Sequence, residues 1–145
     1  MIHNKKIVIT GGAGFIGSHL VDRLSSEDSN EILVFDSFRH GVNDNLAGSV
    51  DKGNVKIING DIRDREQVEK VLTRDVDLVY HLSSIVGIEH YVKDPLEVID
   101  VNVLGTRYVA EMAIKNDIRV LYSSTSEVFG RNPKIPWDED DERVV

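Results

Sequence analysis

Apolar residues along the chain fall into five short runs that predict β-strands. Each run is rich in β-branched or other large apolar residues and ends at a small or polar residue, which is the pattern of buried strands. The predicted strands cover residues 7–9, 32–35, 55–58, 78–82 and 120–122.

Between these runs the apolar residues recur at helical spacing. One helix is predicted from Phe15 to about Ser25. Asp64, with Gln67 three residues later, predicts the start of a short second helix with a capping-box-like pair. Asp94 followed by proline predicts the start of a third helix, which runs to about Asn116.

Strands that alternate with helices indicate a parallel sheet with right-handed crossovers and helices on both faces. The fold class predicted from this order is α/β, a Rossmann-type doubly wound parallel sheet of about five strands. Residues 37–53 are rich in glycine, asparagine and aspartate and predict a long irregular connection.

Composition narrows the class of protein. A chain of 145 residues with 41% hydrophobic and 29% charged residues is typical of one globular domain. The net charge of −8 argues against nucleic acids and anionic membranes as partners. Cysteine is absent, which excludes disulfides and thiolate metal sites. With no apolar run of membrane-spanning length and no signal peptide, we expect a cytoplasmic location.

The turn after the first strand carries Gly11, Gly14 and Gly17. Their spacing differs from the commonest dinucleotide fingerprint, whose first two glycines stand two apart, but the physical requirements are the same. One glycine allows the tight turn, one lets the backbone approach a pyrophosphate, and one lets the helix pack closely on the strand. The helix N-terminus adds unpaired amides and the positive end of its dipole.

Asp36 ends the second predicted strand, where a carboxylate can accept hydrogen bonds from the adenosine ribose hydroxyls. The same charge would repel a 2′-phosphate, so the sequence predicts NAD rather than NADP. Arg39 lies three residues further on, and its positive charge leaves open a weaker preference for NAD over NADP.

The segment Thr10–Leu20 resembles the start of the extended short-chain dehydrogenase/reductase family, of the NAD-dependent epimerase/dehydratase type. The likeness continues in the family's order and spacing over essentially the whole chain. It includes Asp61–Ile62, His81–Ser84, Asn102–Thr106 and Ser123–Gly130. The resemblance implies NAD as cofactor, a nucleotide sugar (a UDP-sugar above all) as substrate, and a homodimer.

The resemblance also assigns cofactor-binding residues. The pyrophosphate is expected on the turn formed by Gly11, Gly14, Phe15, Ile16 and Gly17. Adenine contacts are expected from Asp61 and Ile62, and contacts on the nicotinamide side from Leu82, Ser83 and Ser84. Read without the family, Asp61 is equally an ordinary turn residue and Asn102 a local packing residue.

Two catalytic residues are implied at the exit of the fifth strand. Thr125 matches the serine or threonine that hydrogen-bonds the sugar hydroxyl being oxidised. Glu127 matches a position that is acidic in dehydratases and decarboxylases, and its context looks most like UDP-glucuronate decarboxylase, which oxidises C4, loses CO₂ and re-reduces the ketone. A 4-epimerase and a non-catalytic dinucleotide-binding module remain alternatives, with Thr125 then a turn hydroxyl and Glu127 a loop acid.

The family's Tyr-x-x-x-Lys pair is missing from this sequence. None of the four tyrosines is followed by lysine four positions on. We therefore expect the 145-residue chain alone to bind NAD weakly or not at all and to have no turnover. The expected division is an NAD-binding Rossmann domain at 1–130 and an acidic loop at 131–145 that leads toward a missing sixth strand and substrate domain.

Three further expectations concern surfaces and metals. The histidines have no metal-ligand spacing, so no metal is predicted. The loop Ile88–Tyr91 is expected at the ligand-facing edge, with His90 open as a base, a ligand or a surface residue. In the absence of a partner helix, we expect Val101, Leu104 and Val109 to be exposed.

Overall fold

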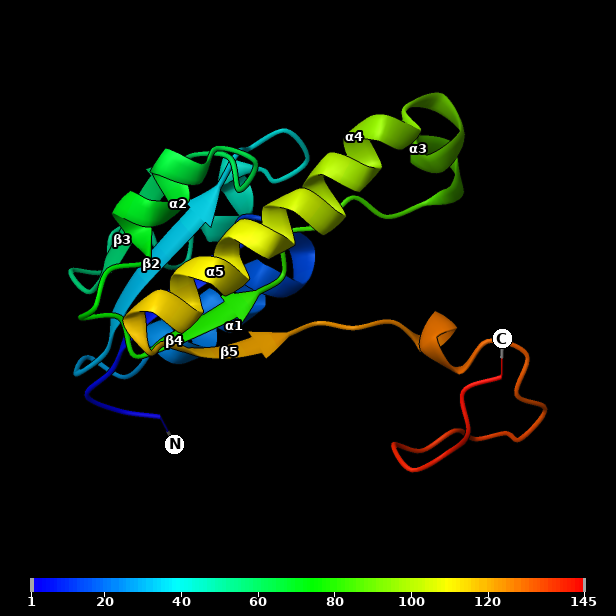
Figure 1. Ribbon diagram of the computed structural model, residues 1–145. Coiled ribbons are helices and arrows are strands. Elements are labelled where there is room, and N and C mark those ends of the chain that lie inside the picture. The colour runs from blue at the N-terminus through cyan, green and yellow to red at the C-terminus, as the bar shows by residue number, and fades with distance from the viewer. Residues whose placement is uncertain (1, 145) are drawn as a thin grey trace.

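The computed structural model describes residues 2–144 and contains a parallel sheet of five strands, flanked by helices on both faces (Figure 1). The spatial order is β3-β2-β1-β4-β5, and every neighbouring pair is parallel. The predicted fold class is therefore confirmed. The strands are β1 (Lys6–Thr10), β2 (Glu31–Asp36), β3 (Val55–Asn59), β4 (Leu78–His81) and β5 (Arg119–Tyr122).

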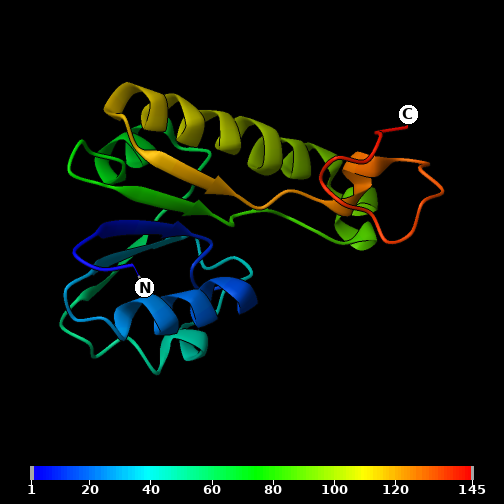
Figure 2. The same cartoon turned by 90° about the horizontal axis from the view of Figure 1, so that it is seen from below.

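The predicted helices form close to their expected bounds. They are α1 (Phe15–Ser25), α2 (Arg65–Val71), α4 (Pro95–Ile99) and α5 (Thr106–Asn116), with the π-helical turn η2 (Asp100–Gly105) between the last two. Backbone angles stay helical through both junctions, so α4, η2 and α5 form one long rod (Figures 1 and 2).

Three short helical segments occur where the sequence predicts loops. They are η1 (Asn43–Leu46), α3 (Ile88–Lys93) and η3 (Ser126–Phe129). Neither α3 nor η3 buries a residue, and η1 buries only Leu46. Segments with so little buried surface have no amphipathic period for a sequence to display, which is why the pattern did not predict them.

The core has two halves, one on each face of the sheet. Ile7 and Ile9 of β1 pack with α1 and η1, whereas Val8, between them, faces α2 and α5. All three side chains are completely buried. Figure 2 shows α1 and the long rod on opposite sides of the sheet. Because β1 is covered on both faces, its sequence is continuously apolar rather than alternating.

One exposure prediction is wrong. Val109 is 1% exposed and packs in the core, and Val101 and Leu104 are half-buried. Val101 and Val109 lie on the side of the rod that packs into the core beneath the sheet. The exposed large apolar residues of the rod are instead Leu96, Ile99, Val103 and Ile114. The first three lie three and four positions apart on α4 and η2.

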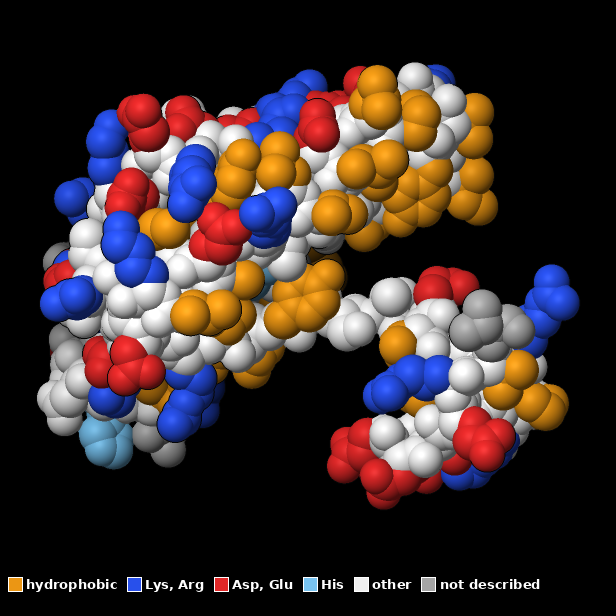
Figure 3. All heavy atoms as spheres, viewed as in Figure 1, with side chains coloured by type: hydrophobic (Ala, Val, Ile, Leu, Met, Phe, Trp, Pro, Cys, Tyr) orange, Lys and Arg blue, Asp and Glu red, His pale blue; other side chains and the backbone are white. Residues whose placement is uncertain are grey.

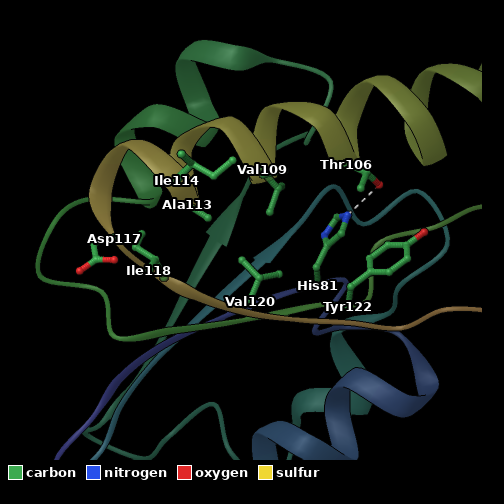
Figure 4. A pocket seen from close by; sticks show the side chains of 10 residues that line it. His81, Thr106, Val109, Ala113, Ile114, Asp117, Ile118, Val120 and Tyr122 are labelled. Atoms are coloured by element: carbon green, nitrogen blue, oxygen red, sulfur yellow. Dashed lines mark hydrogen bonds between the residues drawn. The ribbon is translucent and has the colours of Figure 1, made fainter. Parts of the chain in front are cut away.

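At the open edge of the sheet, all four residues of β5 are exposed. An apolar cavity of about 550 Å³ lies between β5 and α5 (Figure 4). Val109, Ala113 and Val120 line it, and His81 and Tyr122 lie at one end.

The segment after β5 extends beyond the carboxyl edge of the sheet and forms a separate loop (Figure 1). Acidic side chains gather on it (Figure 3). Lys134 pairs with Asp138 at 3.2 Å and with Asp141, and Phe129 stacks on Trp137 with ring centroids 5.3 Å apart. The acidic run is therefore partly neutralised within its own loop.

The cap of α2 differs in one bond from the expected pair. The Asp64 carboxylate accepts the backbone amides of Glu66 and Gln67 at 3.0 and 3.1 Å, and the Gln67 side-chain amide at 2.8 Å. The Gln67 side-chain oxygen, however, accepts the Asp61 amide at 3.0 Å rather than the amide of Asp64. The cap is confirmed, but the prediction of a reciprocal bond is wrong, because the Asp64 amide donates to the Asp61 carbonyl at 3.0 Å instead.

We expect Asp64→Ala to lower the free energy of unfolding by about 1 kcal/mol, because two amides of the first turn lose their acceptor. Asp64→Asn should retain most of the stability, since asparagine keeps an acceptor oxygen. Urea denaturation of the three proteins measures both values. Equal losses in the two variants would contradict the capping role.

Candidate functional site

A cavity of about 750 Å³ opens at the carboxyl edge of the sheet. This edge is where ligands bind in open α/β sheets, next to the strands at which the winding direction changes, here β1 and β4. Every site residue assigned from the sequence lines this cavity: Gly11, Gly14, Phe15, Ile16, Gly17, Asp36, Asp61, Ile62, Leu82, Ser83, Ser84, Thr125 and Glu127.

The glycine turn connects β1 to α1 through a space too narrow for the Cβ atoms of other residues. Gly11 has φ +70°, and a Cβ there would lie 2.8 Å from the Ser83 nitrogen. A Cβ at Gly17 would lie 2.2 Å from the Gly11 carbonyl oxygen. A Cβ at Gly14 would meet the same oxygen at 3.2 Å and otherwise face open space among the described residues. Gly11 thus makes the turn, Gly17 permits close packing, and Gly14 leaves the backbone open to a ligand.

The N-terminus of α1 suits an anion. Its first amides have no carbonyl partner within the helix, and the helix dipole places partial positive charge there. Gly14 caps the helix without a side chain, and the described first turn carries no acidic residue. Nothing on α1 therefore competes with a bound pyrophosphate for these amides.

Asp36 is buried at the end of β2, with its carboxylate held in one orientation. Oδ2 accepts the Ala13 amide at 2.9 Å, and Oδ1 accepts the Phe38 amide at 2.8 Å. Each carboxylate oxygen can accept more than one hydrogen bond, so both retain capacity toward the cavity. This arrangement fits a pair of ribose hydroxyls.

Asp61 and Ile62 follow β3 at the same edge. Arg63 forks onto the Asp61 carboxylate at 2.6–3.0 Å, and this pairing lowers the pKa of Asp61 below its usual range. Ile62 is 4% exposed and packs against Gly105, where a Cβ would lie 2.6 Å from its Cδ1. The predicted adenine contact of this pair remains a prediction.

His81 links the sheet to the rod through buried hydrogen bonds. Its Nδ1 lies 2.7 Å from the Thr10 hydroxyl and its Nε2 lies 3.0 Å from the Thr106 hydroxyl (Figure 4). The Thr106 hydroxyl donates to the Asn102 carbonyl at 2.7 Å. It must therefore accept from His81, which places the imidazole proton on Nε2 and makes Nδ1 the acceptor from Thr10.

The same bonds fix the backbone that lines the cavity. The amides of Leu82 and Ser83 both donate to the Thr10 hydroxyl at 3.2 Å. Asn102 then holds the next part of the chain, because its side chain accepts the Ile85 amide and donates to the Ile85 carbonyl, each at 2.8 Å. The sequence left open a local packing role for Asn102, and this local bonding is present.

Thr125 and Glu127 lie at the rim of the cavity, beyond β5. The Thr125 hydroxyl oxygen accepts the Glu127 amide at 3.3 Å and caps η3. Its hydrogen still serves as a donor, so the turn role and a role toward substrate are compatible. Both side chains are exposed.

The segment Ile88–Tyr91 was expected to be a loop, but it belongs to α3. Tyr91 lines the cavity, whereas the His90 ring packs edge-on against His40 with centroids 5.1 Å apart. Other residues of the cavity carried no recognisable signal in the sequence as ligands. They include Arg63, which follows the Asp61–Ile62 pair after β3, and Glu97 and Tyr122, which the packing of α4 and β5 brings to the cavity.

No helix among residues 2–144 has the length and apolar character needed to cross a membrane. Within the same residues, no group of three or more histidine, aspartate or glutamate side chains is arranged to hold a metal ion.

The parallel sheet, the glycine turn and the carboxylate after β2 define a dinucleotide-binding protein of the Rossmann class. Residues 7–144 match the NAD dependent epimerase/dehydratase family, and the chain belongs to that family. The resemblance found in the sequence is thus confirmed. The family is NAD-dependent, and the turn and Asp36 fit this cofactor.

Similar proteins act on nucleotide sugars. UDP-glucuronic acid decarboxylase 6 of Arabidopsis thaliana is 39% identical over 127 residues, which cover 88% of this chain and 35% of that protein. A solved UDP-N-acetylglucosamine 4-epimerase from Methanobrevibacter ruminantium M1, in complex with UDP-N-acetylmuramic acid, is 34% identical with a TM-score of 0.88. That match covers 99% of this chain and 45% of the epimerase.

A third relative is a solved UDP-glucose 4-epimerase from Bifidobacterium longum, in complex with NAD⁺ and UDP. It is 25% identical with a TM-score of 0.83, over 96% of this chain and 42% of the epimerase. The chain thus spans less than half the length of these relatives. One of the three is a decarboxylase and two are 4-epimerases.

The His81 bonding makes stability depend on pH. Burial lowers the pKa of His81 to about 4, whereas an unfolded histidine titrates near 6.5. The unfolded chain therefore binds more protons between these values, and stability rises with pH across this window. We expect the His81 contribution, about 3 kcal/mol, to be complete above pH 6.5 and to be lost as the pH falls to 4.

Urea denaturation of the native protein and His81→Gln at a series of pH values tests this dependence. The stability difference between them should shrink as the pH falls from 7 to 4. A difference that stays constant over this range would show that His81 does not titrate in this way.

Proposed function

We propose that the chain is the NAD-binding part of a nucleotide-sugar enzyme, and that its reaction is the decarboxylation of UDP-glucuronate. The observation that carries this proposal is that Thr125 and Glu127 line the same cavity as the glycine turn. The similarity to a UDP-glucuronic acid decarboxylase, over 88% of this chain, supports the choice of substrate.

Each group of residues has a distinct task in this proposal. The turn from Gly11 to Gly17 binds the cofactor pyrophosphate, and Asp36 orients the adenosine ribose. Bound NAD supplies a hydride acceptor that is regenerated in each cycle. Thr125 hydrogen-bonds the sugar hydroxyl at the reacting carbon, and Glu127 assists at the neighbouring carbon that bears the carboxylate.

Epimerisation at C4 is the second candidate reaction. It is favoured by the 0.88 TM-score to a UDP-N-acetylglucosamine 4-epimerase, and it needs no acid at position 127. A non-catalytic dinucleotide-binding module needs neither Thr125 nor Glu127 at the cavity. The retention of both residues at its rim supports an enzyme over a module.

We expect the whole enzyme of which this chain is proposed to be a part, incubated with UDP-glucuronate, to release CO₂ and form UDP-xylose. Glu127→Gln should slow CO₂ release about 100-fold or more, the usual size of a lost acid–base contribution. Glu139→Gln is a matched control, because it removes one carboxylate from the acidic loop and should leave the rate unchanged. A C4-epimerised product without CO₂ would favour the second candidate.

We also propose that the protein is a homodimer, with the rod at the interface. Leu96, Ile99 and Val103 are 72%, 54% and 63% exposed along α4 and η2. Figure 3 shows hydrophobic side chains gathered over α3 and α4. An apolar patch of this kind is typical of a protein–protein contact.

The substitutions Ile99→Asp and Val103→Asp should together shift the protein from dimer to monomer, because each places a charge within the apolar patch. Static light scattering measures the mass. Val50→Asp, at an exposed apolar position after η1, is the control and should leave the mass unchanged. A native protein that is already monomeric would rule out this interface.

A further inference from the structure

Four charged side chains form a cluster at the adenosine end of the cavity. Arg39 follows β2, Asp61 and Arg63 follow β3, and Glu97 lies in the first turn of α4. All four line the same cavity as Asp36. We call them the arginine–glutamate cluster.

Glu97 connects this cluster to the rod. Its side chain is 16% exposed, and Oε1 forms an ion pair with Arg39 and lies 3.5 Å from Arg63 Nη1. Among the described residues, Oε1 is buried and has no hydrogen bond of good geometry. A buried carboxylate in this position depends on the charges of the two guanidinium groups. Glu97 is therefore held to the two arginines by charge attraction and not by a bidentate hydrogen-bonded pair.

Arg63 is already paired, but Arg39 depends on Glu97. Arg63 places two of its nitrogens on Asp61, which raises the pKa of Arg63. Within residues 2–144, Arg39 forms one ion pair, the one to Glu97, and its side chain is 51% exposed. The cluster holds two positive and two negative groups, and Asp36 adds a negative charge beside it.

The chemistry of this end bears on the choice between the two nicotinamide cofactors. An aspartate at the ribose suits NAD, whereas a nearby arginine accommodates the 2′-phosphate of NADP. This cavity contains both kinds of residue, so Asp36 alone does not define the selectivity. The decisive question is whether the guanidinium groups are available to a phosphate.

We propose that Glu97 is a specificity residue for the cofactor, which keeps Arg39 and Arg63 from the 2′-phosphate of NADP. Selectivity for NAD then rests on two carboxylates, Asp36 on the sheet and Glu97 on the rod. The proposal depends on NAD binding in this cavity, as proposed above. The proposal assigns a role in cofactor selectivity to a side chain of α4, an element that lies outside the glycine turn and outside the strand that carries Asp36.

The test is a calorimetric titration of the whole enzyme that contains this chain, and of its Glu97→Gln variant, with NAD⁺ and with NADP⁺. Loss of the carboxylate should tighten NADP⁺ binding about tenfold, the size of one charge-assisted contact, and change NAD⁺ binding less than about twofold. The gain should shrink at high salt, because exposed charges are screened.

Two further variants isolate the cause. Glu69→Gln breaks an ion pair of Glu69 with Lys115 that lies outside the cavity, and should leave the ratio of the two affinities unchanged. Adding Arg39→Met to Glu97→Gln should remove most of the gain for NADP⁺, because Arg39 supplies the freed charge. If Glu97→Gln does not fold, Glu97→Met should give the same change, since it also removes the carboxylate that pairs with Arg39.

The outcomes separate this proposal from the one it rests on. If the whole enzyme binds NAD⁺ and Glu97→Gln leaves the affinity ratio unchanged, the proposed role of Glu97 is wrong and the NAD site stands. If the whole enzyme does not bind NAD⁺, both proposals fail.

Discussion

The close approach of Gly17 to Gly11 is the contact on which the rest of this structure depends. A Cβ at Gly17 would lie 2.2 Å from the Gly11 carbonyl oxygen, so α1 can begin directly beside the end of β1 only with glycine there. Gly11 in turn lies against the backbone after β4. These two contacts bring the start of a helix and the ends of two central strands together. The cavity exists because no side chains fill that space.

The hydrogen bonds of His81 are a second constraint, which holds the backbone after β4 at the cavity. His81 is buried between Thr10 and Thr106, with hydrogen bonds from β1 through β4 to the rod. Buried polar groups are costly unless each is paired, and here both ring nitrogens are. The bonds that satisfy His81 also fix the amides of Leu82 and Ser83, which line the cavity. The same hydrogen bonds therefore stabilise the fold and fix the shape of the cavity.

Charged side chains complete the cavity beside Asp36. The rod brings Glu97 to two arginines that follow neighbouring strands, so the cavity presents a neutral cluster beside the carboxylate of Asp36. Partly buried ion pairs of this kind contribute little net stability, because desolvation offsets attraction. In the role proposed for Glu97, their consequence is cofactor selectivity, because they determine which charges the 2′-phosphate of NADP meets.

By itself the sequence determined the order of strands and helices, the bounds of α1, and the glycine turn with its carboxylate. It also identified a set of residues that share one cavity, because the carboxyl ends of parallel strands lie at the same edge of a sheet. These features are local or periodic, so a single chain segment displays them. Only the tertiary structure decided that Val109 is buried, that His81 is neutral with its proton on Nε2, and that Arg39 pairs with Glu97. Each of these depends on the packing of the rod against segments distant in sequence, which no local pattern specifies.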